Sequence, residues 1–282
     1  MLNESSVENY ISDEWYEKIV RFFEEKNILL SSFKKPYIKR RLYFRAQALH
    51  CQKIEDYYKY LKKSSEEYKI FERKLTINVS YFFRNWDTFA IIRDKILPGV
   101  FQKKELKGEK YIKILSIGCA SGEEPYSVAI LLKEYFSEEI KIFKPYILGI
   151  DFDYDSINYG RVGVFDEQRL IFTPDFLLKK YFVKIDSKRY ELKDEIKKMV
   201  ILMQEDVFRK DIKRYWDIVF CRNMLIYVDM KTQESLLKKI HSVCLNDSYL
   251  VLGKSESLWG GLRSLFFPAF PKERIYVKKE SI

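Results

Sequence analysis

The first part of the chain has charged and apolar residues mixed at the spacing of an α-helix. This spacing is clear in "DEWYEKIVRFFEEKNI" and in "KIEDYYKYLKKSSEEYKIFERKL", where apolar positions recur every three or four residues. The stretch contains no glycine and a single proline, Pro36. The pattern predicts an all-helical domain over residues 1–75. A connecting segment, residues 76–110, follows with its own helix near "WDTFAIIRDKIL", which we expect to end at Pro98-Gly99.

From Tyr111 onward, short apolar runs alternate with helical stretches. Six runs are typical of strands: "YIKILSIG", "PYILGIDFD", "MVILMQED", "WDIVFCRN", "SYLVLGKSE" and "ERIYVKKE". Helices are predicted for "PYSVAILLKEYF", "DSINYGRVG" and "KTQESLLKKIHSVCL". This alternation predicts an α/β domain over residues 111–282, with a parallel sheet and helices on both faces. Residues from about 165 to 198 form a small inserted β region in this prediction.

Composition narrows the class of protein. The chain has 282 residues, of which 47% are hydrophobic and 33% charged. These values are expected for a soluble protein of two domains, or of one large domain with an insertion. No apolar run approaches the roughly 18 residues of a membrane span, and the N-terminus lacks the features of a signal peptide. The four cysteines are far apart, so we expect reduced thiols in a cytoplasmic protein. With only two histidines, a histidine-based metal site or catalytic triad is not expected, and no metal is predicted.

The chain is strongly basic, with a formal charge of +10 and a pI near 9.1. One interpretation is an ordinary lysine-rich surface. The others are an acidic protein partner or nucleic acid. Charge alone does not separate them.

The first predicted strand of the α/β region ends in a glycine loop, "SIGCASGEEPYSVAI". Gly118 and Gly122 allow the backbone to approach a ligand closely, and Pro125 suits the first turn of a helix. The loop lacks the dinucleotide pattern G-x-G-x-x-G and the Gly-Lys-Ser/Thr of a P-loop. Glu123 and Glu124 either serve the helix dipole or favour a ligand with hydroxyls or a positive charge over a phosphate.

A carboxylate also follows the second predicted strand, which ends in "GIDFD". Asp151 lies 33 residues after Gly118, and an acidic residue at this place commonly accepts hydrogen bonds from ribose hydroxyls. A solvated turn aspartate is the alternative. Together, the loop and the carboxylate indicate a nucleoside ligand that has a positive centre and no phosphate. S-adenosylmethionine fits this description.

Two arginines lie in neighbouring stretches. Arg84 is part of "LTINVSYFFRN", and Arg222 is part of "DIVFCRNMLIYVD". Each could bind a carboxylate through two parallel hydrogen bonds. The alternative is a surface salt bridge, which contributes little.

Over nearly its whole length the chain resembles the CheR family of chemotaxis receptor methyltransferases. The resemblance lies in five stretches in order: "LTINVSYFFRNWDTF", "SIGCASGEEPYSVAI", "GIDFDYDSINYGRVGVF", "VFCRNMLIYVD" and "LVLGKSESL". It implies a helical N-terminal domain and a Rossmann-like S-adenosylmethionine-dependent methyltransferase domain with a small inserted β-subdomain. It also implies methyl transfer to glutamate side chains of chemoreceptor cytoplasmic domains, with S-adenosylhomocysteine as the product.

The resemblance further implies which residues form the site. The cofactor-binding set consists of Asn78, Ser80, Arg84, Glu124, Asp151, Asp206, Val207, Arg222 and Asn223. Tyr227 matches a family tyrosine near the methyl group, so Tyr227 and Arg84 are the expected catalytic residues. Ser80 stands where threonine is usual, and Asp206-Val207 replaces a common Asn-Leu. Whether Glu123 or Glu124 faces the cofactor stays open.

The chemistry of carboxyl methylation agrees with this resemblance. A glutamate side chain has a pKa of about 4.3 in water, so it is already an anionic nucleophile at pH 7 and needs no general base. The enzyme has to align its oxygen with the sulfonium methyl group, and such positioning supplies roughly 7–11 kcal/mol. The Asn/Asp-Pro-Pro-Tyr stretch of many amine-methylating enzymes is absent.

The stretch "KKPYIKRRLYFRAQAL" predicts a basic helix. Its candidate partner-binding residues are Lys39, Arg40, Arg41 and Arg45. They form either a solvated face or, as the resemblance implies, a surface for the acidic methylation region of receptors, and we favour the second.

Two other functions stay open at this stage. One is a related methyltransferase that acts on RNA or on a non-chemotactic protein. The other is a non-catalytic signalling module that binds S-adenosylmethionine. For the leading function we expect a cytoplasmic monomer that meets chemoreceptor helices, with no nucleic-acid partner and no direct membrane insertion.

Overall fold

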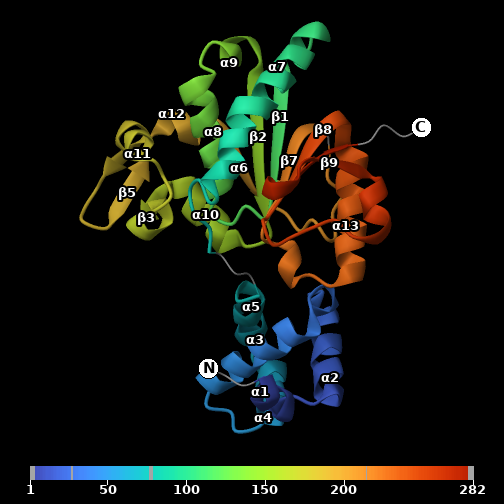
Figure 1. Cartoon of the computed structure of the whole chain (residues 1–282). Coiled ribbons are helices and arrows are strands. Elements are labelled where there is room, and N and C mark those ends of the chain that lie inside the picture. Colours follow the sequence, from blue (N-terminus) through green and yellow to red (C-terminus); the bar gives the residue numbers. More distant parts are fainter. Residues whose placement is uncertain (1–3, 27, 76–78, 214, 279–282) are drawn as a thin grey trace. The chain divides into compact units, whose positions relative to one another are not determined.

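The computed structural model describes residues 4–26, 28–75, 79–213 and 215–278 (Figure 1). The chain forms two compact units, Met1–Ile77 with Tyr227–Gln233, and Asn78–Ile226 with Glu234–Ile282. In the described ranges, no helix is long and apolar enough to cross a membrane. All four cysteines are free thiols, as the sequence predicts.

The first unit is helical, as predicted. Its elements are α1 (Glu4–Tyr10), α2 (Asp13–Glu24), the short 3-10 helix η1 (Leu30–Ser32), α3 (Lys35–Ala48), α4 (Ile54–Lys63) and α5 (Ser65–Arg73). Ser12 and Ser64 precede α2 and α5, and the side chain of each accepts a backbone N–H from the first turn. The core of this unit includes Ile19, Phe23, Leu42, Tyr57 and Phe71.

The second unit is built on a seven-stranded sheet with the order β6-β2-β1-β7-β8-β10-β9. The strands are β1 (Tyr111–Ile117), β2 (Lys144–Asp151), β6 (Val200–Gln204), β7 (Trp216–Cys221), β8 (Cys244–Leu252), β9 (Phe266–Phe270) and β10 (Ile275–Lys278). The pairs from β6 to β8 are parallel, whereas β10 is antiparallel to β8 and β9. The chain runs outward from β1 to β6 and returns to β7 on the other side of β1. This reversal is the place where such sheets bind ligands.

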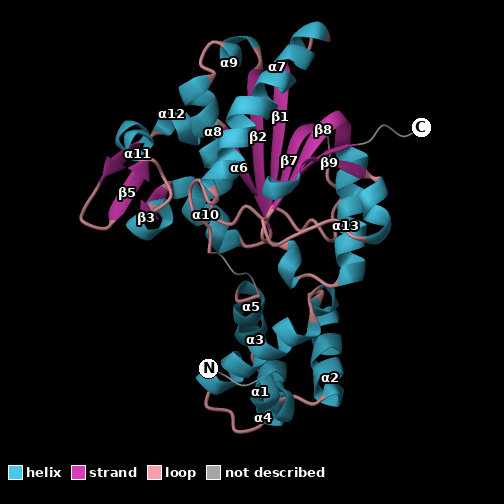
Figure 2. Ribbon diagram, in the orientation of Figure 1, coloured by secondary structure: helices cyan, strands magenta, loops and turns pink. Residues whose placement is uncertain are grey.

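Helices cover both faces of this sheet (Figure 2). Helices α8 (Glu123–Tyr135) and α10 (Tyr154–Val162) pack on one face, and α13 (Met230–Val243) supplies core residues on the other. Side chains of β1 divide accordingly. Ile112 and Ile114 join the core that contains α8, and Leu115 and Ile117 join the core that contains Leu237 of α13. Burial on both faces explains why the central strands β1, β2 and β7 are nearly continuous apolar runs in the sequence.

The helix of the connecting segment runs further than predicted. The expected end at Pro98-Gly99 is wrong, because α6 (Trp86–Ile91) continues through a π-helical turn, η2 (Ile92–Ile96), into α7 (Leu97–Leu106). Pro98 lies in the first turn of α7, where its missing N–H costs little.

A second sheet of three strands has the order β3-β5-β4. It consists of β3 (Val164–Asp166), β4 (Phe182–Lys184) and β5 (Arg189–Leu192), together with the 3-10 helix η3 (Glu167–Leu170) and helices α11 (Asp175–Tyr181) and α12 (Asp194–Lys197). This sheet is the small inserted β-subdomain of the predicted fold.

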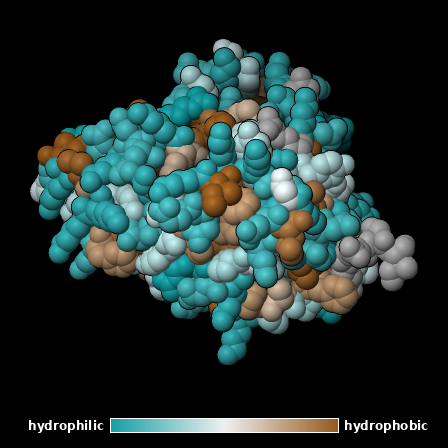
Figure 3. All heavy atoms as spheres, turned by 90° about the horizontal axis from the view of Figure 1, so that it is seen from above, coloured by the Kyte–Doolittle hydropathy of each residue, from teal (hydrophilic) through white to brown (hydrophobic). Residues whose placement is uncertain are grey.

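Hydrophilic side chains predominate on the face shown in Figure 3, and hydrophobic ones form only small groups there. Scattered apolar residues are ordinary on protein surfaces. This face therefore does not indicate a binding site. The carboxyl ends of the parallel strands are the better candidate.

Candidate active site

Three loops of the second unit begin where neighbouring parallel strands end. They are residues 118–122 after β1, 152–153 after β2 and 222–226 after β7. The connecting segment reaches the same place, since Nη2 of Arg222 donates to the carbonyl oxygen of Arg84 and to Oδ1 of Asn85, both at 2.9 Å. The carboxyl ends of β1, β2 and β7 thus share one site with residues 84–85.

Backbone strain concentrates in these segments. Seven non-glycine residues of the described chain have a positive φ, and four of them lie here: Phe83, Asn85, Ala120 and Asn223. Such conformations cost about 1–3 kcal/mol each and cluster at functional sites. The strained residues therefore lie after β1 and β7 and in the connecting segment. The strand order predicts a ligand site at the same place, the carboxyl ends of these strands.

The glycine loop is fixed to the end of β2. The N–H groups of Gly118 and Cys119 both donate to the carbonyl oxygen of Ile150, at 2.8 and 3.1 Å. Gly118 and Gly122 have φ values of +69° and +86°, which favour glycine. The N–H of Ala120 donates to Oδ2 of Asp151 at 2.8 Å.

Asp151 therefore has a role that the sequence did not predict, because its carboxylate shapes the glycine loop. Its other oxygen, Oδ1, accepts the N–H of Asp153 at 2.9 Å. The side chain is buried, and this burial raises its pKa to about 6, against the lowering effect of the backbone N–H donors. Each oxygen has a further lone pair, so the group can still accept hydrogen bonds from a ligand.

The two glutamates of the loop have different surroundings. Oε1 of Glu124 accepts a hydrogen bond from the hydroxyl of Ser116 on β1 at 2.8 Å, and Oε2 accepts one from Nη1 of Arg222 at 3.0 Å. Glu123 is 0% exposed and is paired with Arg169 of the β-subdomain. Glu124 is therefore the residue that bridges the ends of β1 and β7.

The two predicted carboxylate-binding arginines are engaged within the chain. The side chain of Arg222 is 3% exposed, and its hydrogen bonds go to Glu124 and to residues 84–85. Its guanidinium also lies 5.7 Å from the ring centroid of Phe89. Arg84 is half-buried, and its Nη1 donates to the carbonyl oxygen of Val79 at 3.4 Å. Arg222 thus anchors Glu124 and the connecting segment.

The loop after β7 depends on a residue that sequence reasoning missed, Glu256. Its carboxylate accepts N–H groups from Asn223 and Leu225, both at 2.8 Å, and from Gly253 at 2.6 Å. Burial raises the pKa of Glu256, partly offset by these donors. The stretch "LVLGKSESL" contains it, and an acidic residue just after a strand and a glycine was the available signal.

The remaining predicted cofactor residues are placed as follows. Oδ1 of Asp206 closes a turn after β6 by accepting the N–H of Phe208 at 2.9 Å. Val207 is buried and lines a cavity of about 550 Å³, together with Ile150 of β2. Ser80 is half-buried. Asn78 lies outside the described residues.

Tyr227 belongs to the first unit, not to the unit that carries the three loops. Its ring centroid lies 5.0 Å from that of Tyr37, and its carbonyl oxygen accepts the N–H of Lys34 at 2.9 Å.

The basic residues of α3 also lie in the first unit, and most have partners within it. Lys39 is buried and binds Asp13 at 2.7 Å. Arg45 holds the buried Glu67 through two hydrogen bonds of 2.6 Å, and Nε of Arg41 donates to the hydroxyl of Tyr37 at 3.2 Å. Arg40 is exposed, with its guanidinium 5.6 Å from the ring of Phe44. Lys39 and Arg45 therefore stabilise the unit, whereas Arg40 is accessible.

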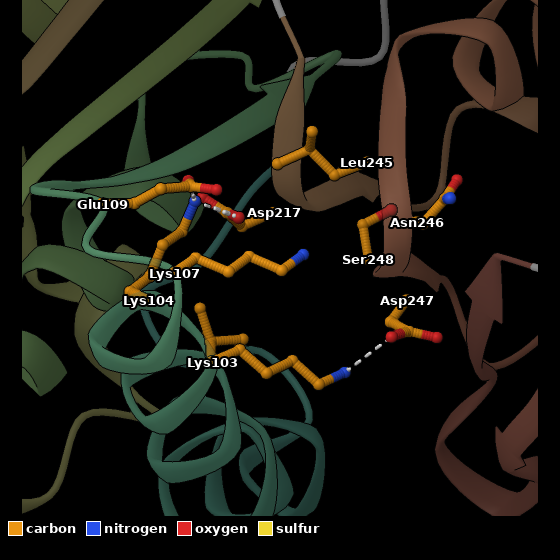
Figure 4. A pocket seen from close by; sticks show the side chains of 10 residues that line it. Lys103, Lys104, Lys107, Glu109, Asp217, Leu245, Asn246, Asp247 and Ser248 are labelled. Carbon is orange, nitrogen blue, oxygen red and sulfur yellow. Dashed lines mark hydrogen bonds and ion pairs between the residues drawn. The ribbon is translucent and has the colours of Figure 1, made fainter.

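A different pocket, of only about 30 Å³, lies near the amino end of β7. Figure 4 shows the side chains of Lys104, Glu109 and Asp217 pointing toward one another there. The ammonium of Lys104 lies 2.7 Å from Asp217 and 2.5 Å from Glu109. Both carboxylates thus bind the same ammonium group within the chain. The pocket is at the opposite end of β7 from the strained loops, so we do not assign it to the site.

The hydrogen-bonding groups at the carboxyl ends of the parallel strands fit S-adenosylmethionine. Asp151 suits the ribose hydroxyls, Glu124 suits a positively charged amino group, and the described parts of the site loops contain no lysine that could bind a phosphate. A Rossmann-like sheet with these groups defines an S-adenosylmethionine-dependent methyltransferase.

Comparison with known proteins agrees with this class and narrows it. Residues 16–76 match the family model described as CheR methyltransferase, all-alpha domain, and residues 78–269 match CheR methyltransferase, SAM binding domain. The chain therefore belongs to the CheR methyltransferase family, and its cofactor is S-adenosylmethionine.

Relatives with chemotaxis names cover nearly the whole chain. The "Chemotaxis protein methyltransferase" of Borreliella burgdorferi is 34% identical over 256 residues, which is 89% of this chain and 90% of the relative. The "Chemotaxis protein methyltransferase 2" of Vibrio cholerae is 29% identical over 84% of this chain and 83% of its own. The "Chemotaxis protein methyltransferase" of Salmonella typhimurium is 26% identical over 88% of this chain and 85% of the relative. The protein is thus an S-adenosylmethionine-dependent methyltransferase of chemotaxis.

Proposed function

We propose that this methyltransferase acts on glutamate side chains in the cytoplasmic domains of chemoreceptors and forms glutamate methyl esters. The observation that carries the proposal is the composition of the site. In their described parts, the connecting segment up to residue 85 and the three loops contain no histidine and no lysine. Histidine and lysine are common general bases, and the carboxylates at the ends of the strands, Asp151 and Glu124, already bind backbone N–H groups and Arg222. A carboxylate is the acceptor that needs no general base, because it is already ionised at neutral pH.

The residues that we propose for the cofactor follow from the contacts at the sheet edge. Asp151 accepts from the ribose hydroxyls and Glu124 from the amino group, while Asp206 and Val207 lie beside the adenine. S-adenosylmethionine supplies an electrophilic methyl group when bound. Arg222 keeps Glu124 in place, and Glu256 holds the backbone at Asn223.

Other roles in this proposal rest on the family resemblance. Asn78, Ser80 and Arg84 complete the cofactor site from the connecting segment. Tyr227 orients the acceptor oxygen. Together with Arg84 it forms the proposed catalytic pair.

The proposed partner is the glutamate-bearing helical region of a chemoreceptor, and the proposed location is the cytoplasm, where that region lies. Of the basic residues of α3, Arg40 and Arg41 are the candidates for contact with an acidic surface. Lys39 and Arg45 contribute by keeping α3 folded against Asp13 and Glu67.

Labelled S-adenosylmethionine and purified receptor cytoplasmic domains test this function. We expect label on the receptor domains, and mass spectrometry should place the added methyl groups on glutamate side chains. Asp151→Ala should abolish most of the labelling. Transfer to lysine, arginine or RNA in the same assay would contradict the proposal.

A further inference from the structure

A partly buried hydrogen-bond network ties the glycine loop to the β-subdomain. Its centre is Arg169, in helix η3. Nη1 of Arg169 donates to the hydroxyl oxygen of Ser121 at 3.0 Å and, in a shorter contact, to Oε1 of Glu123. The hydroxyl of Ser121 donates in turn to the same oxygen of Glu123 at 2.9 Å. One guanidinium therefore holds both the end of the glycine loop, at Ser121, and the first residue of α8, Glu123.

The same residue holds the connecting segment through its backbone. The carbonyl oxygen of Arg169 accepts the N–H of Phe82 at 2.9 Å. The next residue, Phe83, donates its N–H to the hydroxyl of Ser127 on α8 at 2.9 Å. The ring of Phe82 also packs edge-on against Phe165 of β3, with centroids 4.9 Å apart. Both segments that border the cofactor site thus converge on Arg169.

The charge of Glu123 makes this arrangement sensitive to Arg169. Glu123 has no solvent exposure, and a buried carboxylate needs a charged partner or several donors. Of the residues that the structure describes, Arg169 alone forms an ion pair with it. Without Arg169, the hydroxyl of Ser121 and the carboxylate of Glu123 both lose the donor that fixes their positions, and Gly122 lies between these two residues in the chain.

We propose that Arg169 is a positioning residue for S-adenosylmethionine. It lies in the β-subdomain, and it fixes the glycine loop and the connecting segment in the geometry that binds the cofactor. The β-subdomain is therefore a determinant of cofactor affinity. The inference rests on the placement of the cofactor against the glycine loop and is independent of the acceptor that the enzyme methylates.

Calorimetric titration with S-adenosylhomocysteine tests the inference without any acceptor. We expect Arg169→Met to raise the dissociation constant about tenfold, the usual size of the effect when a buried polar group loses its partner. Arg169→Lys should restore part of the affinity, because it keeps the positive charge. The matched control is Arg189→Met on β5, which removes an exposed arginine whose side chain binds the local turn residue Asp186. The affinity of this variant for S-adenosylhomocysteine should be unchanged.

A second variant separates positioning from general loss of stability. Arg169→Met also leaves Glu123 buried and unpaired, which lowers the melting temperature. The double variant Glu123→Gln with Arg169→Met removes that charge, so its melting temperature should recover while its dissociation constant stays raised. The inference would be overturned if Arg169→Met bound S-adenosylhomocysteine as tightly as the unaltered protein does. It would also be overturned if the double variant recovered its affinity together with its melting temperature. If the unaltered protein fails to bind, the cofactor site itself is misplaced and the inference falls with it.

Discussion

At the scale of single residues, Asp151 shows how the fold sets the charge of a side chain. Burial raises its pKa from 3.8 to about 6. Because the raised pKa favours the protonated form in the folded state, the stabilisation from this group is complete below about pH 4 and is lost as the pH rises through about 6. Cofactor affinity follows the opposite trend, since the ionised carboxylate is the stronger acceptor for hydroxyl donors.

We therefore predict that the affinity for S-adenosylhomocysteine rises by up to about tenfold between pH 5 and pH 7, the range over which Asp151 ionises. Calorimetric titration at a series of pH values measures this change. Asp151→Asn, which cannot ionise, is the control and should show a flat profile. The same slope in both proteins would mean that another group controls binding.

Glu256 gives a prediction about stability, because one carboxylate serves three backbone N–H groups in two loops. Glu256→Ala leaves those donors without their acceptor inside the protein. The free energy of unfolding should fall by about 3 kcal/mol. Urea denaturation measures it. Glu138→Ala is the matched control, since Glu138 is exposed and forms a surface ion pair with Lys141; there the change should stay within about 1 kcal/mol.

The sequence locates the candidate residues along the chain but does not show the hydrogen bonds that they form within it. The end of the second predicted strand locates Asp151 in the fold. Its carboxylate, however, accepts a hydrogen bond from the N–H of Ala120, which lies 31 positions earlier in the chain. Arg222 was predicted to bind a ligand, whereas its partners Glu124 and Asn85 lie 98 and 137 positions away. Such pairings are set by tertiary packing, which local sequence patterns do not report.

At the scale of elements, α10 must approach the glycine loop closely. A Cβ atom on Gly160 would lie 2.3 Å from the backbone oxygen of Ser121, and a backbone atom cannot give way without moving the loop. Gly160→Ala should therefore lower both the stability, by about 2 kcal/mol or more, and the cofactor affinity. Thermal unfolding and calorimetric titration measure the two effects.

The control for Gly160 is Gly99, another glycine within a helix. Apart from Gly99 itself, its chain neighbours and the backbone of its own helix, no atom of the described residues lies within 4 Å of a Cβ at Gly99. Alanine there should therefore stabilise α7 by about 0.5–1 kcal/mol. Equal effects of the two substitutions would show that the contact with Ser121 is unimportant.

Helices and strands were predictable where their burial produces a regular pattern of apolar residues in the sequence. Strands β1, β2 and β7 were found because they are buried apolar runs bounded by turns. Strand β6 was found because its sequence is apolar, although it lies at the edge of the sheet and alternate residues are exposed. Strand β9 was missed because "FFPAF" contains a proline, which an edge strand tolerates. The passage from α6 to α7 was missed because a π-helical turn has no sequence signal as clear as the Pro-Gly pair that follows it.

At the scale of the whole molecule, the charge of +10 should assist the encounter with an acidic receptor. Arg40 is exposed on α3, so Arg40→Glu should slow receptor methylation severalfold at low salt and less at high salt, because salt screens the attraction. Initial rates at several salt concentrations measure this. Lys59→Glu changes the net charge equally from α4, where the exposed Lys59 pairs with Asp56. If both variants slow the reaction equally, net charge matters and the α3 surface does not.

The product of the reaction provides the last prediction. A methylated carboxylate is an ester, which mild alkali hydrolyses to methanol, whereas methylated amines and ring nitrogens survive. Transfer to glutamate also removes a negative charge, and loss of a like charge between neighbouring helices changes their packing. We therefore expect the label transferred by this protein to be released as volatile methanol after treatment with base. Tyr227→Phe should lower the rate more than the cofactor affinity if the hydroxyl orients the acceptor oxygen. Label that stays on the substrate through alkali would contradict carboxyl methylation, although the fold and the cofactor would stand.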